Sequence, residues 1–97
     1  MEKVVVRGII HRIYDNPAES GANWWVHPYC ITLYTKPPTV VFYMFFSSIT
    51  KLEQHHFTEG ESVIVKGFLR FKWVRSHKKH CLTAIERGVE SDFVNYE

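Results

Sequence analysis

The sequence predicts an all-β protein, a five-stranded barrel with one short helix, formed by a single domain of 97 residues. Apolar residues occur in five strand-length runs, and only one segment, between the third and fourth runs, has helical spacing. Gly8 and Gly67 interrupt the first and fourth runs. A glycine inside a long strand marks a bulge or a sharp coil, which a small barrel needs where one strand serves both halves of the closed sheet.

The first two strands are predicted at residues 3–14 and 24–34. The first is rich in β-branched residues, which favour strands. Residues 15–23 are turn-forming and are expected to be a loop. Pro28 indicates that the first half of the second strand lies at an edge or a bulge, because proline cannot donate a ladder hydrogen bond.

The third strand is predicted at residues 39–46, TVVFYMFF, after a short connector that contains two prolines. This run is apolar on both faces, which is typical of a buried strand. We therefore expect Phe42, Phe45 and Phe46 to fill the core or a subunit interface.

A short helix is predicted from about residue 48 to residue 57. Apolar residues recur there at helical spacing from Ile49 onward, and Ser47 or Ser48 can cap the first turn. Gly60 ends this region and starts the turn into the fourth strand.

The last two strands are predicted at residues 62–74 and 80–87, with a loop between them. A five-stranded sheet with one helix between its third and fourth strands is the OB-fold, a Greek-key barrel. An SH3-like barrel also has five strands but lacks a helix at this position. The OB-fold is expected to span residues 1–87, and residues 88–97 to form a tail or a short extra element.

The net charge of +2 hides an asymmetry along the chain. Six cations follow one another without an acid: Lys66, Arg70, Lys72, Arg75, Lys78 and Lys79. From Glu86 onward, acids outnumber bases. A basic block of this kind fits a polyanion footprint, although a solvated loop gives the same pattern.

Targeting signals and membrane-length segments are not expected in this chain. Its start has no apolar signal region, and its longest apolar run, residues 39–46, has the length of a strand. Cys30 and Cys81 have no CxxC context, so we expect them to be reduced, buried and apolar in character. A cytoplasmic, nucleoid-associated location is expected.

Unpaired nucleotides require ring faces for the bases and cations for the phosphates. Alternation along the fourth strand predicts one face that points inward, made of Val63, Val65, Leu69 and Phe71. The opposite face is predicted to point outward and carries Lys66, Phe68, Arg70 and Lys72. Phe68, flanked by three cations, is therefore the leading candidate for a platform on which a base stacks.

Other aromatic residues are further stacking candidates, namely Trp24, Trp25, Tyr34 and Trp73. Adjacent residues in a strand point to opposite faces, so only one of Trp24 and Trp25 is expected to be available. The phosphate contacts are expected from Arg75, Lys78 and Lys79 in the loop between the last two strands, together with Arg12 on the first strand. Such contacts hold the backbone and do not read sequence.

A metal site or an active site is not expected. His77, His80 and Cys81 could supply some ligands, but a closed zinc site needs about four with compatible spacing. The sequence has no nucleophile elbow and no phosphate-binding glycine loop before a helix. We therefore expect no cofactor and no enzymatic activity.

The fourth strand resembles that of bacterial single-stranded DNA-binding proteins and of the related primosomal replication protein N. The matching positions are Gly60, Val63, Gly67, Leu69, Arg70 and Trp73, and the first strand, VVVRGIIHRI, runs through a glycine in a similar manner. The chain differs in that Trp73 follows Leu69 and Arg70 more closely, and the long glycine- and proline-rich tail with its acidic end is missing. That difference leaves open any function in recruiting partners.

The resemblance implies a protein that binds single-stranded DNA with little sequence preference during replication, recombination or repair. A homodimer or homotetramer is also expected, since Val4, Val5 and Val6 are predicted near an edge and one small OB-fold covers few nucleotides. Two alternatives stay open. One is an interaction module that docks a replication helicase or polymerase, and the other is an RNA-binding protein, because the same chemistry accepts RNA.

Overall fold

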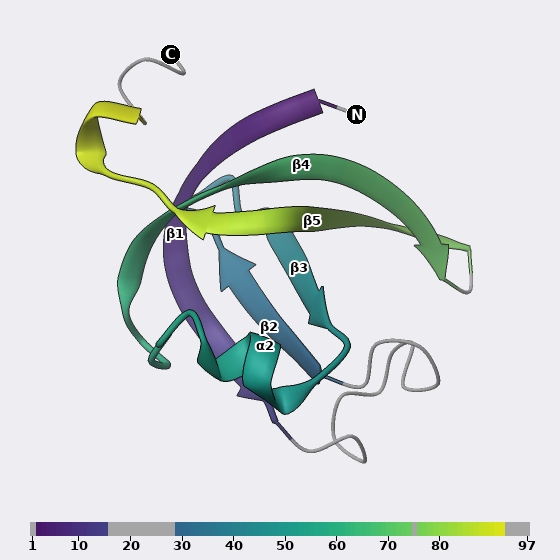
Figure 1. Ribbon diagram of the computed structural model, residues 1–97. Helices are drawn as coiled ribbons and strands as arrows, with labels where there is room; N and C mark the ends of the chain where they lie inside the picture. Colours follow the sequence, from purple (N-terminus) through teal and green to yellow (C-terminus); the bar gives the residue numbers. More distant parts are fainter. Residues whose placement is uncertain (1, 16–28, 75, 93–97) are drawn as a thin grey trace.

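The computed structural model describes residues 2–15, 29–74 and 76–92, which form a closed five-stranded barrel with one short helix (Figure 1). The elements, in chain order, are β1 (Glu2–Tyr14), β2 (Tyr29–Tyr34), β3 (Val41–Phe46), α2 (Ile49–Glu53), β4 (Ser62–Val74) and β5 (His77–Arg87). No helix in the described part of the chain is long and apolar enough to cross a membrane.

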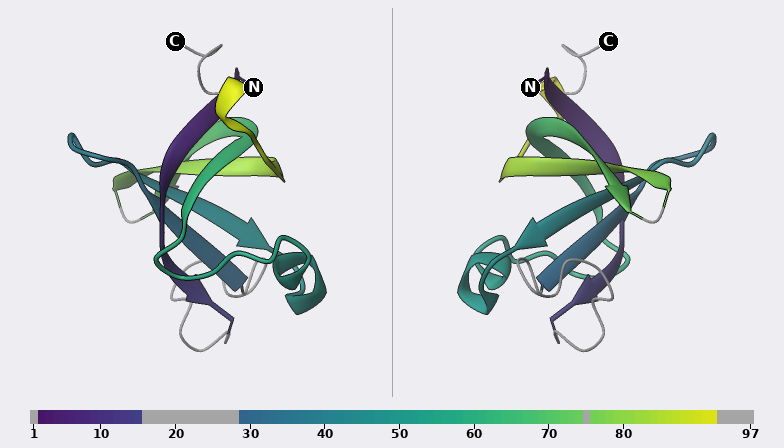
Figure 2. Two further views of the ribbon diagram at one scale, coloured as in Figure 1. Left: turned by 90° about the vertical axis from the view of Figure 1, so that its left-hand side faces the viewer. Right: turned by 90° about the vertical axis from the view of Figure 1, so that its right-hand side faces the viewer.

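The barrel closes in the order β1-β2-β3-β5-β4. All neighbouring strands are antiparallel except β3 and β5, which pair in parallel through Phe42 with His80, Tyr43 with Cys81 and Met44 with Leu82. The side views in Figure 2 show α2 at one end of the barrel and the β2–β3 hairpin projecting to the side. This is the OB-fold, and the predicted fold class is confirmed.

Strand β1 serves both halves of the barrel by coiling at Gly8. Residues 2–9 of β1 pair with β4, and residues 9–14 pair with β2. A Cβ atom on Gly8 would lie 2.6 Å from the carbonyl oxygen of Tyr34, so a side chain at this position would push the two strands apart. The predicted role of the mid-strand glycine is confirmed here.

The valines at the start of β1 belong to the barrel. Val4 and Val6 are 4% and 7% exposed and point into the core, and Val5 pairs with Lys66 of β4. The apolar character of Val4 and Val6 is therefore explained by the core of one chain, and the expected subunit contact stays a prediction.

A bulge at Gly67 coils the β4–β5 pair. The register shifts between Lys66 and Phe68, and a Cβ atom on Gly67 would lie 2.9 Å from the carbonyl oxygen of Thr83. On the opposite strand Ala84 has a positive φ of 52°, a conformation that non-glycine residues rarely adopt. The bulge therefore fixes where the β4–β5 pair coils, and the backbone of Ala84 is strained at that position.

The core is made of the inward-facing residues of all five strands, with Leu52 of α2 and Phe57 closing one end. Phe46 is buried in this core, and Phe42 packs against it while partly buried. Phe45 does not belong to the core, so the expected core position is wrong for that residue, while the alternative of a subunit interface stays a prediction. Because Phe42, Met44 and Phe46 already fill the inner face of β3, alternation directs Phe45 outward.

Helix α2 is shorter than predicted. The side-chain hydroxyl of Ser48 accepts a hydrogen bond from the backbone N–H of Lys51, which confirms Ser48 as the cap. The helix ends at Glu53 rather than near residue 57, and His56, with a φ of 54°, turns the chain away from the helical path.

The connection from α2 to β4 is held by Arg87 at the end of β5. Its guanidinium donates hydrogen bonds to the carbonyl oxygens of His55 at 3.0 Å and His56 at 2.9 Å, and it pairs with Glu61 at 3.3 Å. The same group lies 4.4 Å from the ring centroid of Phe57. Burial, followed by the charge of Arg87, lowers the pKa of His55 below its ordinary value.

Strand β5 begins earlier than predicted, at His77 rather than His80. Lys78 and Lys79 therefore lie on a strand, and their expected place in a loop is wrong. Between β4 and β5 the structure describes Ser76, whose φ of 68° suits a tight reversal of the chain. The predicted start of the second strand, residues 24–28, lies outside the described residues, and β3 starts at Val41 rather than at residue 39.

Candidate nucleic-acid interface

Beyond the bulge, β4 and β5 continue as a two-stranded ribbon that runs past the end of the barrel (Figure 1). We call residues 70–74 and 77–81 the distal ribbon. Its pairs run from Arg70 opposite Cys81 to Val74 opposite His77. Alternation gives the distal ribbon two faces, and one of them continues the outer surface of the barrel.

Strand register places one row of side chains on the outward side of all five strands, although Thr32 and Cys81 in this row are buried. The row runs through directly paired positions on the five strands, in the order Arg12, Thr32, Tyr43, Cys81 and Arg70. Paired residues point to the same side of a sheet, so these residues share one face. The pairs of Tyr14 with Cys30 and of Cys30 with Phe45 place a second row beside the first.

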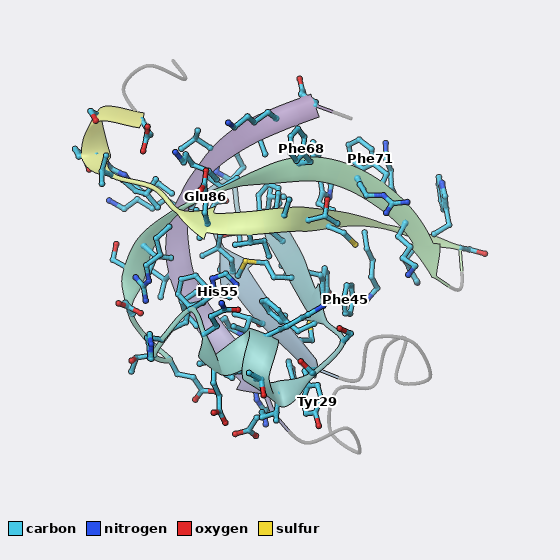
Figure 3. The ribbon with its side chains drawn as sticks, in the orientation of Figure 1. Tyr29, Phe45, His55, Phe68, Phe71 and Glu86 are labelled. Carbon is cyan, nitrogen blue, oxygen red and sulfur yellow. The ribbon has the colours of Figure 1, made fainter. Side chains whose placement is uncertain are left out.

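Two aromatic rings of β3 stack on each other at the centre of this face. The rings of Tyr43 and Phe45 are 6.1 Å apart between centroids and nearly parallel, at 9°. The Lys79 ammonium lies 4.3 Å from the Tyr43 centroid, and the Lys72 ammonium lies 5.8 Å from the Phe45 centroid. We call the surface of these four residues and Arg70 the outer-face groove; Figure 3 shows Phe45 below the strand that carries Phe68 and Phe71.

The aromatic pair stands between two hollows. The first, of about 160 Å³, is lined by Phe45, Arg70, Phe71, Lys72, Cys81, Leu82 and Thr83. The second, of about 430 Å³, is lined by Thr39, Val40, Val41, Tyr43, His77, Lys78, Lys79 and His80. Phe45 thus borders the first hollow, and Tyr43 borders the second.

The cations of the distal ribbon have no acidic partners in the part of the chain that the structure describes. No carboxylate there lies within ion-pair distance of Arg70, Lys72, Lys78 or Lys79. Lys66, on the other side of the bulge, pairs with Glu86 at 3.4 Å and Asp92 at 3.8 Å. The electrostatic potential around the distal ribbon is therefore positive, because no carboxylate of the described residues neutralises these cations.

The two cysteines lie under the outer-face groove. Cys30 is 2% exposed and Cys81 is 5% exposed, as the sequence predicts. Burial raises the pKa of Cys30 to about 12. Burial also raises the pKa of Cys81, and the nearby charges of Lys72, Lys79 and Arg70 oppose that rise, which reflects how closely the cations surround the groove floor.

The opposite face of the distal ribbon, which we call the reverse face, carries Phe71, Trp73, Lys78 and His80. Phe71 and Trp73 are 48% and 68% exposed. The Lys78 ammonium lies 3.9 Å from the Phe71 centroid, and the His80 ring meets that of Phe71 edge-on at 4.9 Å. The predicted inward position of Phe71 is thus wrong, because β4 has left the core at this point and the inward side of the strand faces solvent.

The structure places several predicted site residues on the outer face. Arg70, Lys72 and Lys79 come together in the outer-face groove. Arg12 lies farther along the same face, 5.0 Å above the ring of Tyr14.

The remaining predicted site residues lie away from the outer-face groove or outside the residues that the structure describes. Tyr34 stacks on His11 at 4.0 Å, near the end of β2. Phe68 is half-buried and pairs with Lys3, and its expected neighbour Lys66 is engaged by acids. Lys78 and Trp73 belong to the reverse face, while Trp24, Trp25 and Arg75 lie outside the described residues.

Sequence reasoning missed Tyr43 and Phe45. The signal was present, since Val41, Tyr43 and Phe45 alternate with Phe42, Met44 and Phe46. It was hidden because all six residues are apolar or aromatic, and a continuous run of this kind is typical of a strand buried on both sides.

Comparisons with protein-family models, with curated proteins and with solved structures find no match to this chain. The likeness to bacterial single-stranded DNA-binding proteins therefore stays an interpretation of the motif in residues 60–73. Among the residues that the structure describes, no group of three or more metal-ligating side chains is found.

Proposed function

We propose that this protein is a non-catalytic OB-fold protein that binds single-stranded DNA in the outer-face groove. The observation that carries the proposal is the stacked pair Tyr43–Phe45, bordered by Lys72, Lys79 and Arg70 in a region where the described residues offer these cations no carboxylate. Rings supply platforms for bases, and the cations supply contacts for phosphates.

Stacking of a base on an aromatic ring of the groove is more favourable than the cation–π contact that it would displace. An exposed cation–π contact such as that of Lys79 on Tyr43 contributes about 0.5–1 kcal/mol. A base stacked on the same ring contributes about 1–3 kcal/mol, and the displaced ammonium gains a phosphate while releasing a counterion. Stacking therefore outweighs the contact that it replaces.

The same surface favours single strands over duplexes. In a duplex the faces of the bases are covered by their neighbours, so the rings of Tyr43 and Phe45 would have nothing to stack on. Phosphate contacts from Lys72 and Lys79 carry no sequence information, and low sequence preference is expected from them. The likeness in β4 favours DNA over RNA, although the chemistry of the groove accepts both.

Assembly into a homodimer or homotetramer belongs to the same proposal. One outer-face groove spans few nucleotides, and a second groove on a linked copy would raise the affinity through effective concentration. Replication, recombination or repair on the nucleoid is the setting that we propose for such an assembly.

The experiment that tests the proposal is a titration with labelled oligo-dT and with a duplex of equal length, followed by fluorescence anisotropy at low and moderate salt. We expect oligo-dT to bind, the duplex to bind far more weakly, and the affinity to fall as salt rises. Tyr43→Ala and Phe45→Ala should each weaken binding about tenfold, from the loss of one stacked base. Lys51→Ala, an exposed cation on α2, serves as the control and should bind as the wild type does. Equal binding of duplex and single strand would contradict the proposal.

A second candidate function is a module that docks another protein, such as a replication helicase or polymerase. The observation that favours it is the exposure of Phe71 and Trp73 on the reverse face. Salt separates the two functions, because an aromatic protein interface weakens much less with ionic strength than phosphate contacts do.

A further inference from the structure

The N-terminal half of β1 has a neighbouring strand on one side only, among the residues that the structure describes. Residues 2–9 pair with β4, whereas β2 pairs with β1 only from Ile9 onward, because β2 ends at Tyr34. Figure 1 shows this half of β1 running beside β4. We call residues 3–8 of β1, on the side away from β4, the open edge.

The backbone of the open edge offers hydrogen-bonding groups to an added strand. Ile10 directs its N–H and C=O toward β4, where they bond to Glu61 at 2.9 Å and Gly60 at 2.7 Å. These groups alternate between the two sides of an antiparallel strand, so those of Val5 and Lys3 point away from β4. No described residue bonds them there. A donor and an acceptor on alternate residues match the edge of another strand.

A hollow of about 440 Å³ follows the open edge, and its volume is within the range of ligand sites. Its lining contains consecutive residues of β1, from Val5 to Ile9, together with Phe42 at the start of β3. Val6 belongs to the core, Phe42 packs against the core, and Ile9 is apolar but 45% exposed. An inward-pointing side chain of an added strand would therefore meet apolar surface.

The charges around the hollow favour an acidic partner. No carboxylate is among the lining residues, whose two cations are Arg7 and Lys36. Arg7 pairs with Glu90, whereas Lys36 has no carboxylate within ion-pair distance among the described residues. Lys3, at the other end of the open edge, is exposed and has no ion pair in the described chain. An acid at each end of a short added strand would therefore lie near a cation.

A second copy of β1 fits the open edge less well than an acidic strand does. Antiparallel pairing of two copies about Val5, in the middle of the edge, would place Lys3 of each copy opposite Arg7 of the other. Like charges directly opposite each other destabilise a pair of strands. The charges therefore favour a segment of a different protein.

We propose that the open edge of β1 binds an extended, acidic segment of another protein, which adds a strand in line with β2 and antiparallel to β1. The residue opposite Val6 points inward and is a large apolar residue over Phe42. The residue opposite Val5 exchanges two backbone hydrogen bonds with it. The residues at the two ends are acids. This site shares no lining residue with the outer-face groove, so the inference goes beyond the proposed single-strand binding.

The test uses the peptide acetyl-Glu-Phe-Val-Val-Glu-amide, titrated into the isotope-labelled protein while NMR chemical shifts are followed. In the proposed register its Phe lies opposite Val6 and its central Val opposite Val5. We expect saturable shifts of residues 3–9 and of Thr35 and Lys36. The permuted peptide acetyl-Phe-Glu-Val-Glu-Val-amide has the same composition but turns its acids inward. It should bind about tenfold or more weakly, because no Phe side chain is buried.

Two methylated peptides test the backbone hydrogen bonds. Methylation of the central Val nitrogen blocks a bond to Val5 and should weaken binding about fivefold or more. Methylation of the Phe nitrogen, which points away from β1, is the matched control and should change the affinity less than about threefold. Val5→Pro removes the same bonding site from the protein, and the two methylated peptides test it independently if that variant does not fold.

The charge contribution is tested by Lys36→Glu, which should weaken binding of the acidic peptide about threefold or more. Lys51→Glu, an exposed position on α2, makes the same change of net charge and should leave the affinity as it is in the wild type.

Equal affinities for the acidic and the permuted peptide, equal affinities for the two methylated peptides, or no saturable shift with any of them would overturn the inference. Shifts of residues 3–9 that depend on protein concentration without peptide would assign the open edge to a second copy instead. Displacement of the peptide by oligo-dT would assign it to nucleic acid, again against the inference. Loss of oligo-dT binding alone, with the peptide still bound at the open edge, would contradict only the proposed function.

Discussion

The two halves of the β4–β5 pair are built from the same strands but differ in how their charges are compensated. In the half next to β1, Lys66 pairs with Glu86 and Asp92, and Arg87 pairs with Glu61. In the distal ribbon the cations lie over aromatic rings, and no acid of the described chain reaches them. The first arrangement stabilises the fold, whereas the second leaves the cations of the distal ribbon without a neutralising acid among the described residues.

The bulge at Gly67 and Ala84 separates the two halves. On one side of it, odd-numbered residues of β4 such as Val63 and Val65 are buried in the core. On the other side, Phe71 and Trp73 continue the same alternation but have no core to meet. A single strand thus changes within a few residues from one that packs into the core to one whose apolar side chains face solvent.

Among the predicted effects, charge reversal in the distal ribbon should change the affinity for oligo-dT the most. Lys72→Glu combined with Lys79→Glu should weaken oligo-dT binding more than about thirtyfold, because each new carboxylate repels phosphate and removes a counterion-releasing contact. Fluorescence anisotropy at moderate salt measures the change. Lys36→Glu combined with Lys51→Glu changes the net charge equally, away from the groove, and should lose much less affinity. Equal losses in the two double variants would show that overall charge, and not the distal ribbon, determines binding.

Substitution at the bulge should disturb the fold at the point that divides the halves. Gly67→Ala places a Cβ atom 2.9 Å from a backbone oxygen and should lower the free energy of unfolding by about 1–3 kcal/mol. Ala84→Gly, in the same bulge, relieves a positive φ and should raise it by up to about 1 kcal/mol. Urea denaturation followed by tryptophan fluorescence measures both. A Gly67→Ala variant more stable than the wild type, or an Ala84→Gly variant less stable than it, would mean that the bulge is not strained.

The ion pair of Lys66 should contribute to stability in a small way and to binding hardly at all. Glu86→Gln removes one partner of Lys66 and should lower the free energy of unfolding by less than about 1 kcal/mol, as is usual for exposed pairs. Its oligo-dT affinity should stay within about threefold of that of the wild type, because the groove lies on the other side of the bulge. Arg70→Gln should show the reverse pattern, with unchanged stability and weaker binding.

The smallest predicted effect is a pH dependence of stability. It arises in the half of the β4–β5 pair next to β1, where ion pairs neutralise the cations. Burial and the charge of Arg87 lower the pKa of His55, so the folded state holds His55 neutral more firmly than the unfolded chain does. This contribution is fully present above the ordinary histidine value of 6.5 and is lost as the pH falls below it. His55→Gln should flatten that part of the stability profile, as measured by urea denaturation between about pH 5 and pH 7, a range chosen to span the value in the unfolded chain. A profile that keeps its slope in His55→Gln would assign the effect to another group.

The fold could be predicted from the sequence because its signals are local. Strand-length runs, the glycines at positions 8 and 67 and the cap at Ser48 each act through nearby backbone geometry, and all three are confirmed. The length of β5 could not be predicted in the same way. Residues 77–79 are polar and sit in a ribbon with no buried face, so no alternation of apolar and polar residues marks them as a strand.

The candidate site could be predicted in part. The outward direction of Arg70 and Lys72 follows from alternation along β4 and is confirmed. Tyr43 and Phe45 could not be identified, because a fully apolar strand does not reveal which of its faces is covered. That information depends on the register between β3 and β5, which joins residues far apart in the sequence.

The central claim is that the aromatic pair of β3 and the distal ribbon form the surface that meets single-stranded DNA. The most direct measurement is NMR chemical-shift mapping of the labelled protein during titration with oligo-dT. The account predicts that the large shifts fall on residues 43–45, 70–72 and 79–81, while residues 64–66 and 86–92 change little. Large shifts around Lys66 and the residues after Glu86, with the rings of Tyr43 and Phe45 unaffected, would contradict it.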